Sequence, residues 1–441
     1  MTPHKKMTRM TLTVSAYVPG ALNRVSRTCA VGVMLLANHA AAAQITEVAN
    51  GNASEDSEIV EIEADGSLDD TTGSLDVVAT DHRLAANVDV RTAYSDLDSD
   101  DRDGGNSGVD SFRTRWRLQG VYNVTDRIRL GGRIAGICSD FECEPTFISD
   151  SSIPTQNGIS DGDIAIDTLF IHRFRSEHYD VAAGRLQTKF VARGGIFSKS
   201  LDRNDSNNMR VNWTDGVHGT YRARKGWVSH GILQYNSASG SGSVRRDPLD
   251  FMNPGSRVTY FYGIENLEPQ RNLLQRGFDI TYLPKSLMTD GATSGRVDDY
   301  WGLVARVAGR WPRRSEGPRL RFSSELGYAP KTQTRAAANL EGTGDVDGWA
   351  WNVTASIMDF LPAHSIGINY GRTDPGWLLS PQYGNNEELY EIRYSWRRDA
   401  HFSVDVRVRR RTDLEQRIDA KRKREINDFF VRFTWGFASK T

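Results

Sequence analysis

The chain has 441 residues, of which 38% are hydrophobic and 25% are charged. That leaves too little apolar sequence for a bundle of membrane helices, each of which needs about 20 apolar residues. Aromatic residues make up 10% of the chain and only 14 residues are proline, so the chain is not disordered overall and we expect it to fold.

The formal net charge of −1 hides a segregation of charge along the chain. Residues 1–43 carry five basic side chains and no acidic one, and residues 44–81 carry eleven acidic side chains and no basic one. The remainder is therefore mildly basic, with a net charge of +5. Its cations are mostly arginine, whose rigid fork suits carboxylate and phosphate recognition.

The first 43 residues are typical of an export signal, with basic residues up to Arg27, an apolar stretch at 29–37 and three alanines at 41–43. The apolar stretch is shorter than the roughly 17 to 25 residues of a membrane anchor, so we expect cleavage after Ala43. The acidic residues 44–81 contain no aromatic residue and show no sustained period. They are predicted to form a flexible periplasmic segment.

From residue 82 onward, apolar and polar residues alternate with period two, which predicts strands with two different faces. In one such stretch, Phe112 and Trp116 share one face, while Arg113, Arg115 and Arg117 share the other. This alternation predicts sixteen strands, at residues 82–94, 112–122, 127–137, 164–175, 178–186, 216–224, 227–236, 257–264, 276–283, 300–311, 318–328, 348–358, 364–372, 387–397, 400–410 and 427–437.

The connections between these strands alternate in length, short after even-numbered strands and long after odd-numbered ones. The connection at 265–275 departs from this rule, because it is long where a short turn is expected. The pattern is typical of an all-β fold, a transmembrane antiparallel β-barrel of the bacterial outer membrane with long extracellular loops. A secreted β-sandwich is the alternative, but tryptophans and tyrosines near the strand ends favour membrane girdles.

The first long loop contains an acidic run with a spacing similar to that of a calcium loop. Ser99, Asp101, Asp103, Gly104 and Asp110 occupy positions one, three, five, six and twelve of that spacing. Position one lacks its carboxylate and position twelve is not glutamate, so a solvated acidic loop without metal is the preferred interpretation.

Two cysteines remain once Cys29 leaves with the export signal. Cys138 and Cys143 lie in an acidic loop, and an exported protein meets an oxidising compartment, so we expect a disulfide between them. Two free thiols are the alternative. A zinc site is disfavoured because no second Cys or His pair lies nearby in the sequence.

If the apolar faces of the strands meet lipid, the opposite faces line a water-filled interior, because a charge facing lipid costs about 2 to 4 kcal/mol at the midplane. The arginines predicted to line the pore and bind anions are Arg113, Arg115, Arg117, Arg129, Arg133, Arg306, Arg319, Arg321, Arg407 and Arg409. The predicted inward acids are Asp89, Asp167, Asp180, Asp279, Glu325, Glu391, Asp405 and Asp428. We expect an electropositive bore that prefers anions such as phosphate or carboxylates. The alternative is that many of these arginines form structural ion pairs with the acids of the wall.

Familiar catalytic motifs are missing from the sequence, so we expect no enzyme and no cofactor. An adhesin or receptor barrel is the alternative to a channel. A membrane-embedded hydrolase that uses His172 or His218 is a more distant one.

The stretch from Phe429 to Phe437 is apolar at alternate positions and ends on an aromatic residue. It resembles the terminal strand by which outer-membrane barrels are recognised for assembly, although a short tail at 438–441 follows it. With the run from Ala183 to Phe190 entering a long third loop, residues 82–437 resemble a porin, and loosely the phosphate-selective porins.

The resemblance implies a trimeric channel whose third loop, residues 187–213, folds into the lumen; we call this segment the constriction loop. A bend at Gly194 and Gly195 would help it fold. Its charged residues would be Lys189, Arg193, Lys199, Asp202, Arg203, Asp205 and Arg210. The implied partners are outer-membrane lipid and lipopolysaccharide, two further copies of the chain in a homotrimer, and the barrel assembly machinery at the last strand. No nucleic-acid partner is expected.

Overall fold

The computed structural model describes residues 83–140, 143, 146–148, 162–173, 176–205, 209, 211–236, 252, 257–290, 296–312, 317–380 and 382–440. The predicted export signal at 1–43, the predicted acidic segment at 44–81 and Arg210 lie outside these residues. No helix among the described residues is long and apolar enough to cross a membrane.

The described chain is all-β. Its strands are β1 (Leu84–Asp100), β2 (Asn106–Thr125), β3 (Ile128–Ser139), β4 (Thr146–Ile148), β5 (Asp163–Arg173), β6 (Tyr179–Leu186), β7 (Thr214–Arg222), β8 (Trp227–Gln234), β9 (Thr259–Asn266), β10 (Leu273–Met288), β11 (Val297–Trp311), β12 (Arg319–Tyr328), β13 (Trp349–Leu361), β14 (His364–Thr373), β15 (Glu387–Arg397), β16 (Phe402–Asp413) and β17 (Glu425–Lys440).

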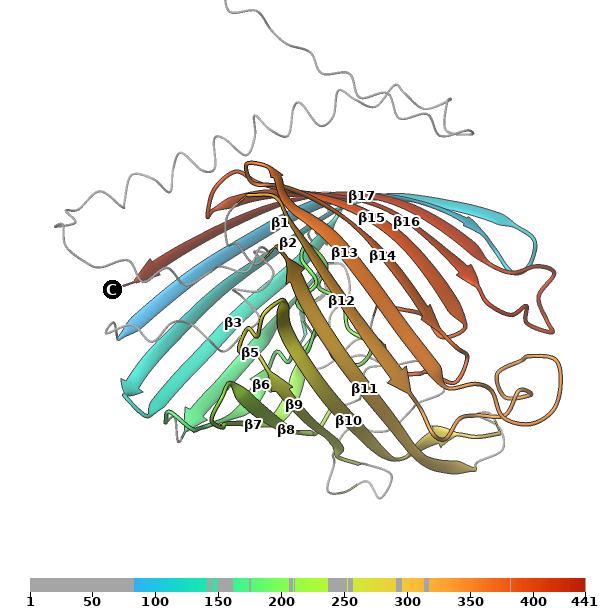
Figure 1. Cartoon of the computed structure of the whole chain (residues 1–441), viewed down its shortest axis with the longest axis horizontal. Coiled ribbons are helices and arrows are strands. Elements are labelled where there is room, and N and C mark those ends of the chain that lie inside the picture. The colour runs from blue at the N-terminus through green and yellow to red at the C-terminus, as the bar shows by residue number, and fades with distance from the viewer. Residues whose placement is uncertain are drawn as a thin grey trace, which may run out of the picture. The chain divides into compact units, whose positions relative to one another are not determined.

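Consecutive strands pair in antiparallel fashion, and β1 also pairs with β17, so the sheet closes on itself. In Figure 1, β1 lies directly beside β17 at this seam. The three-residue β4 is an addition that pairs in parallel with β5. Each of the other sixteen strands corresponds to one predicted strand, which confirms the sixteen-stranded antiparallel barrel.

Several strands extend further than the alternation predicted. β1 and β2 continue to a turn at 101–105, so the predicted first long loop is mostly a paired ribbon. β9 and β10 leave only residues 267–272 between them, which restores the short turn expected at that end. β17 runs to Lys440, so the predicted tail after residue 437 is part of the last strand instead.

The outer surface of the barrel is apolar, as lipid requires. Ile368, Ile392, Val408 and Phe429 form one row across β14–β17, and the middle two are 55% and 54% exposed. Stacked or tilted aromatic pairs also lie on neighbouring strands, for example Tyr370 with Tyr390, whose ring centroids are 4.5 Å apart. A closed barrel with this outer surface is the architecture of outer-membrane proteins.

Candidate functional site

The constriction loop folds into the lumen, as the porin resemblance implied. It contacts the inner faces of strands elsewhere in the wall: the backbone N–H of Arg193 donates to Gln275 on β10 (2.8 Å), and that of Leu201 donates to Glu325 on β12 (3.1 Å). Further along the wall, Arg393 on β15 donates to the carbonyl of Ile196 (3.2 Å). The loop is therefore fastened across the barrel interior.

The close approach of this loop to the wall needs glycine at two successive positions. Gly195 has a φ of +81°, a left-handed conformation that favours glycine. A Cβ at Gly194 would lie 2.1 Å from the Ser323 hydroxyl oxygen and 2.3 Å from that of Thr354. The carbonyl of Gly194 accepts a hydrogen bond from Ser356 (3.1 Å). The predicted bend is present, and its backbone packs directly against the barrel wall.

Four of the predicted constriction-loop charges are engaged in the protein interior. Asp202 accepts from Ser200 (2.8 Å), Arg203 donates to Gln234 (2.9 Å), and Asp205 accepts from Thr188 (2.8 Å) and Thr214 (2.7 Å). Lys199 pairs with Glu391 (2.6 Å) on β15. Burial lowers the pKa of the Lys199 amine to about 7, although Glu391 acts in the opposite direction.

Two further charges of the loop are less enclosed. Lys189 is half-buried and forms a β-bridge with Asn204 through its backbone. Arg193 is exposed. Of the described basic residues in this loop, Arg193 presents the most open side chain to the interior water.

A buried carboxylate cluster surrounds Arg306 on β11. Its guanidinium lies 3.2 Å from Glu325, 3.6 Å from Asp202 of the constriction loop and in contact with Asp279. Three carboxylates around one arginine make this side of the lumen acidic. Arg306 was predicted to bind anions, and its position among acids makes it a structural ion-pair partner instead.

The arginines of β2 and β3 are engaged in a second network. Arg115 lies 2.7 Å from Asp89, while Arg117 and Arg133 lie 3.1 Å and 2.8 Å from Asp167. Arg115 and Arg117 are 0% and 1% exposed. The predicted ladder of Arg113, Arg115 and Arg117 is thus divided: two members are buried ion-pair partners, and Arg113 is exposed.

The other predicted pore arginines also have neighbours in the wall. Arg407 and Arg409 share Asp428. Arg319 pairs with Asp359 (3.0 Å), Arg129 donates to Asn123 (3.1 Å), and Arg321 is buried. For many of these side chains the ion-pair alternative describes the structure better than a row of open anion sites.

Part of the lumen is filled by a loop that the alternation did not single out. Residues 374–386 between β14 and β15 carry Trp377, Leu378 and Leu379, all buried in a cluster with inward residues such as Tyr300. The indole N–H of Trp377 donates to the carbonyl of Leu201 (2.9 Å), which braces the constriction loop from the extracellular side. The signal that could have found it was an apolar run inside a predicted surface loop.

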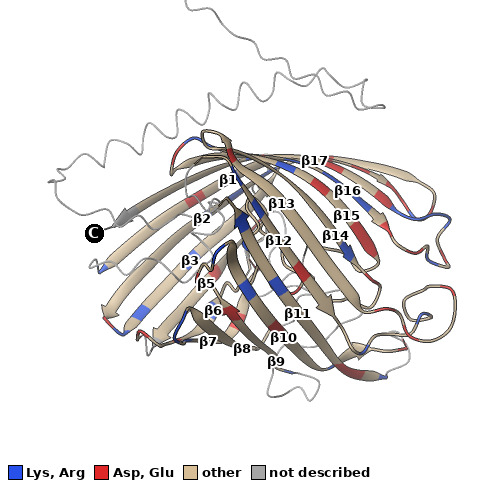
Figure 2. Ribbon diagram, in the orientation of Figure 1, with Lys and Arg blue, Asp and Glu red and all other residues tan. Residues whose placement is uncertain are grey.

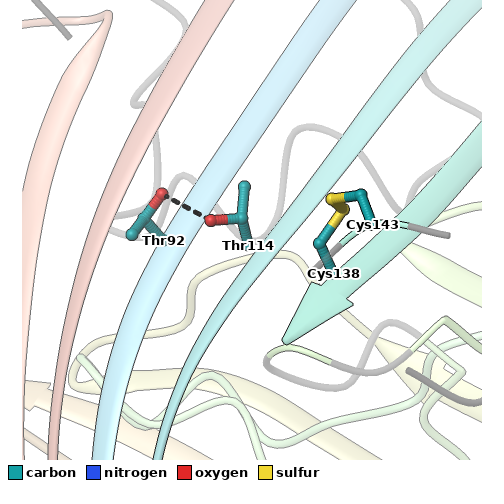
Figure 3. Close-up of a disulfide and its surroundings, with 4 residues drawn as sticks. All are labelled: Thr92, Thr114, Cys138 and Cys143. Carbon is teal, nitrogen blue, oxygen red and sulfur yellow. Dashed lines mark hydrogen bonds between the residues drawn. A yellow bond between two sulfur atoms is a disulfide. The ribbon is translucent and has the colours of Figure 1, made fainter. Parts of the chain in front are cut away.

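Cys138 and Cys143 are bonded to each other at the extracellular end of β3, with their Cα atoms 4.9 Å apart. Figure 3 shows this disulfide beside Thr114, which is the ladder partner of Cys138. The hydroxyl of Thr114 lies 3.3 Å from that of Thr92. The disulfide therefore joins Cys143 to the end of β3.

The calcium-like spacing does not form a single loop. Asp101 and Asp103 lie in the β1–β2 turn, where Asp101 accepts from Ser99 (2.6 Å) and Asp103 accepts from the N–H of Gly105 (2.8 Å). Asp110 lies in β2, paired with Asp96 of β1. Two of the five positions, Ser99 and Asp110, belong to paired strands, so the five residues do not share one loop.

No protein-family model and no curated protein matches the chain. Among solved structures, the chain is similar to OprB of Pseudomonas putida at 10% identity, with 80% of this chain and 94% of that chain covered and a TM-score of 0.49. It is also similar to OpdQ of Pseudomonas aeruginosa at 12% identity, with 80% and 98% covered and a TM-score of 0.48. OpdK of the same organism, solved with vanillate, gives 12% identity, 81% and 99% coverage and a TM-score of 0.44. Each of these likenesses has a TM-score below 0.5 and an identity below 25%, so none of them shows what this chain does.

Proposed function

We propose that the chain is a channel of the cell outer membrane through which small hydrophilic solutes diffuse, with a preference for anions such as carboxylates or phosphate. The observation that carries the proposal is the opposite chemistry of the two faces of one closed wall. Ile392 and Val408 face outward on β15 and β16, while their neighbours Glu391, Arg393 and Arg407 face the interior. A barrel that holds ionised groups inside and apolar groups outside is suited to conduct water-soluble molecules.

The preference for anions is supported by the balance of charge on the strands around the seam, which we call the arginine wall. Figure 2 shows basic and acidic positions side by side on neighbouring strands there. The ladder registers turn ten arginines of β15, β16, β17, β1 and β2 inward, Arg393, Arg397, Arg407, Arg409, Arg411, Arg432, Arg91, Arg113, Arg115 and Arg117, against six carboxylates, Glu387, Glu391, Asp405, Asp413, Asp428 and Asp89. This excess survives the ion pairing, so the potential along this side of the lumen favours anions.

Exposed arginines on the interior surface offer the most accessible contacts for a passing anion. Arg113 is exposed on the lumen face of β2, and Arg193 is exposed on the constriction loop. A guanidinium binds carboxylate or phosphate with two parallel hydrogen bonds. Because an exposed guanidinium is also hydrated, its binding is weak enough for the solute to leave. We further propose, as the porin resemblance implies, that the channel assembles as a homotrimer and contacts lipopolysaccharide in the outer membrane.

The test is single-channel recording of the purified barrel in a planar bilayer under a salt gradient. The expected result is stable ohmic steps with a reversal potential on the anion side. Arg113→Gln together with Arg193→Gln should shift that potential toward cation preference. Arg398→Gln, which removes an exposed charge from the β15–β16 turn, is the matched control and should leave it unchanged. Absence of conductance steps from correctly folded barrels would favour the adhesin or receptor alternative, and a cation-selective wild type would contradict the anion preference.

A further inference from the structure

The barrel wall is interrupted between β5 and β6, near the end at which β6 leads into the constriction loop. β6 pairs with Leu169–Arg173 of β5, whereas Asp163–Ala165 of the same strand pair with the short β4. At the break between these two ladders, the guanidinium of Arg185 on β6 donates to the carbonyl of Ile166 (3.0 Å). A side chain therefore takes the place of a strand partner at this point of the wall.

A cavity of about 670 Å³ lies at this interruption, and its lining includes Ile166, Leu169, Ala183 and Val217. Leu169 is 58% exposed, whereas the next residue, Phe170, is buried on the lumen side. Successive residues of a strand alternate between the two faces, and ladder partners share a face, so Ala183 and Val217 lie on the same face as Leu169. The cavity therefore opens on the outer surface of the barrel.

Besides apolar side chains, the lining contains one ion pair. Arg185 donates to the two carboxylate oxygens of Asp215 (2.8 and 3.1 Å), and its guanidinium lies over the ring of Trp213, 4.3 Å from the centroid. The Asp215 side chain is 30% exposed. Because Asp215 already neutralises this arginine, the cavity favours an apolar ligand over a free anion. The open side of the carboxylate can accept a hydrogen bond at the edge of the cavity.

We propose that this cavity binds an acyl chain of lipopolysaccharide, an inference that rests on the proposed placement of the barrel in the outer membrane. The cavity is continuous with the apolar surface that meets lipid. Ile134, Ile171 and Leu233, which are ladder partners of its lining residues, are exposed apolar side chains on that surface. An acyl chain inside the cavity gives the lining side chains the close contacts that drive association within a membrane.

The position of the cavity favours the outer leaflet. Tyr235, which lines it, is the first residue of the long connection between β8 and β9. Tyr260 on β9 is the ladder partner of Leu233 and stacks with Tyr282 on β10, with ring centroids 5.9 Å apart. Such tyrosines mark a membrane–water boundary, here the one beside the long extracellular loops. Lipopolysaccharide forms the leaflet on that side, and a hydroxyl or amide N–H at the base of its acyl chains can donate to Asp215.

The experiment is native mass spectrometry of the folded barrel in detergent, with lipid A or phosphatidylethanolamine added in separate samples. We expect lipid A to stay bound to the chain when the detergent is removed, and phosphatidylethanolamine to be lost. Ala183→Phe places an aromatic ring inside the cavity and should abolish the adduct with lipid A. Val217→Phe fills the same space from β7 and should do the same, so the test does not depend on the folding of a single variant.

The matched control is Ala305→Phe, which adds the same ring to the outer face of β11, where Ala305 is exposed beside Phe278. This control should retain lipid A as the wild type does, and heat-modified migration in gels establishes that each variant is folded. An undiminished adduct in both cavity variants, or equal retention of phosphatidylethanolamine, overturns the proposal. So does a wild type that binds no lipid A but forms oligomers that Ala183→Phe dissociates, because a second copy then covers the cavity. These measurements require no conduction, so they separate the lipid site from the channel function.

Discussion

The ammonium of Lys199 lies 2.6 Å from a carboxylate oxygen of Glu391, so an ion pair joins the constriction loop to β15 on the opposite wall. Glu391 also pairs with Arg393 (2.8 Å), which in turn donates to the loop carbonyl of Ile196. One carboxylate therefore organises two of the contacts that hold the loop in place. The stability of this anchor depends on whether Lys199 carries its proton.

The first prediction is that the loop is held less firmly below about pH 7 than above it. Burial lowers the pKa of Lys199 from its usual 10.5 to about 7, although Glu391 acts in the opposite direction, so the seated loop favours the neutral amine, whereas a released loop keeps the amine charged in water. Seating therefore becomes more favourable as the pH rises above about 7. Single-channel current noise should fall between about pH 6 and pH 8.5. Lys199→Arg, which stays charged throughout, should remove that change. Equal pH dependence in both proteins would show that another group is responsible.

The wall of the barrel was predictable because its signal is local. Alternation along Phe112 to Tyr122 reports directly which residues face lipid. An even number of antiparallel strands allows the first and the last strand to pair in the same antiparallel manner, as a closed barrel requires. Strand ends were less accurate where polar residues face outward beyond the membrane. Asp96 and Asp98 continue the ladder of β1 although they carry no apolar signal.

The interior was predictable only in part, because its contacts join residues far apart in the chain. The inward phase of Arg117 and Asp167 was correct, but their pairing depends on the register of three strands. Asp167 is itself the extra residue of a bulge in β5, opposite Arg133 and Ile134 of β3. The same is true of Trp377: the apolar run around it was a local signal of burial, but its hydrogen bond to the carbonyl of Leu201 joins two loops that are far apart in the chain. Alternation alone therefore predicted an open ladder of arginines, two of which the fold places in buried ion pairs.

The second prediction separates buried from open arginines. Asp167→Asn removes the carboxylate that pairs with both Arg117 and Arg133, and loss of one side of a buried ion pair costs about 3 to 5 kcal/mol. The temperature at which the barrel loses its folded migration in gels should fall markedly. Arg113 lies on the same face of β2 as Arg117 but is exposed, so Arg113→Gln should leave that temperature nearly unchanged. Equal stability of the two variants would contradict the buried network.

The third prediction concerns the seat of the constriction loop. Gly194→Ala places a methyl group within 2.9 Å of both the Ser323 hydroxyl and its Cβ, so the loop cannot approach the wall as closely. We expect a folded barrel with larger or noisier conductance. Gly120→Ala is the matched control, because a Cβ there meets nothing within 4 Å. Unchanged conductance in Gly194→Ala would mean that the loop does not limit the current.

The last prediction tests the seam between β1 and β17. Their register extends from Ala85 with Lys440 to Asp100 with Glu425, so β17 supplies one whole edge of the closing pair. Deleting residues 427–441 leaves β1 and β16 without that strand, and exposed strand edges are not tolerated in lipid. We expect no heat-modifiable barrel in the membrane fraction.

Deleting residues 438–441 is the milder change. It removes the pairing of Ala438, Ser439 and Lys440 with the first residues of β1 and leaves the register from Phe437 with Val88 onward. Insertion should persist, with a modest fall in the temperature at which the folded form is lost, because the shortened segment lies at the end of the seam. Lys440→Ala, which keeps the backbone pairing, should show no such fall. Membrane-inserted, heat-modifiable barrels from the larger deletion would show that β17 is not needed to close the wall.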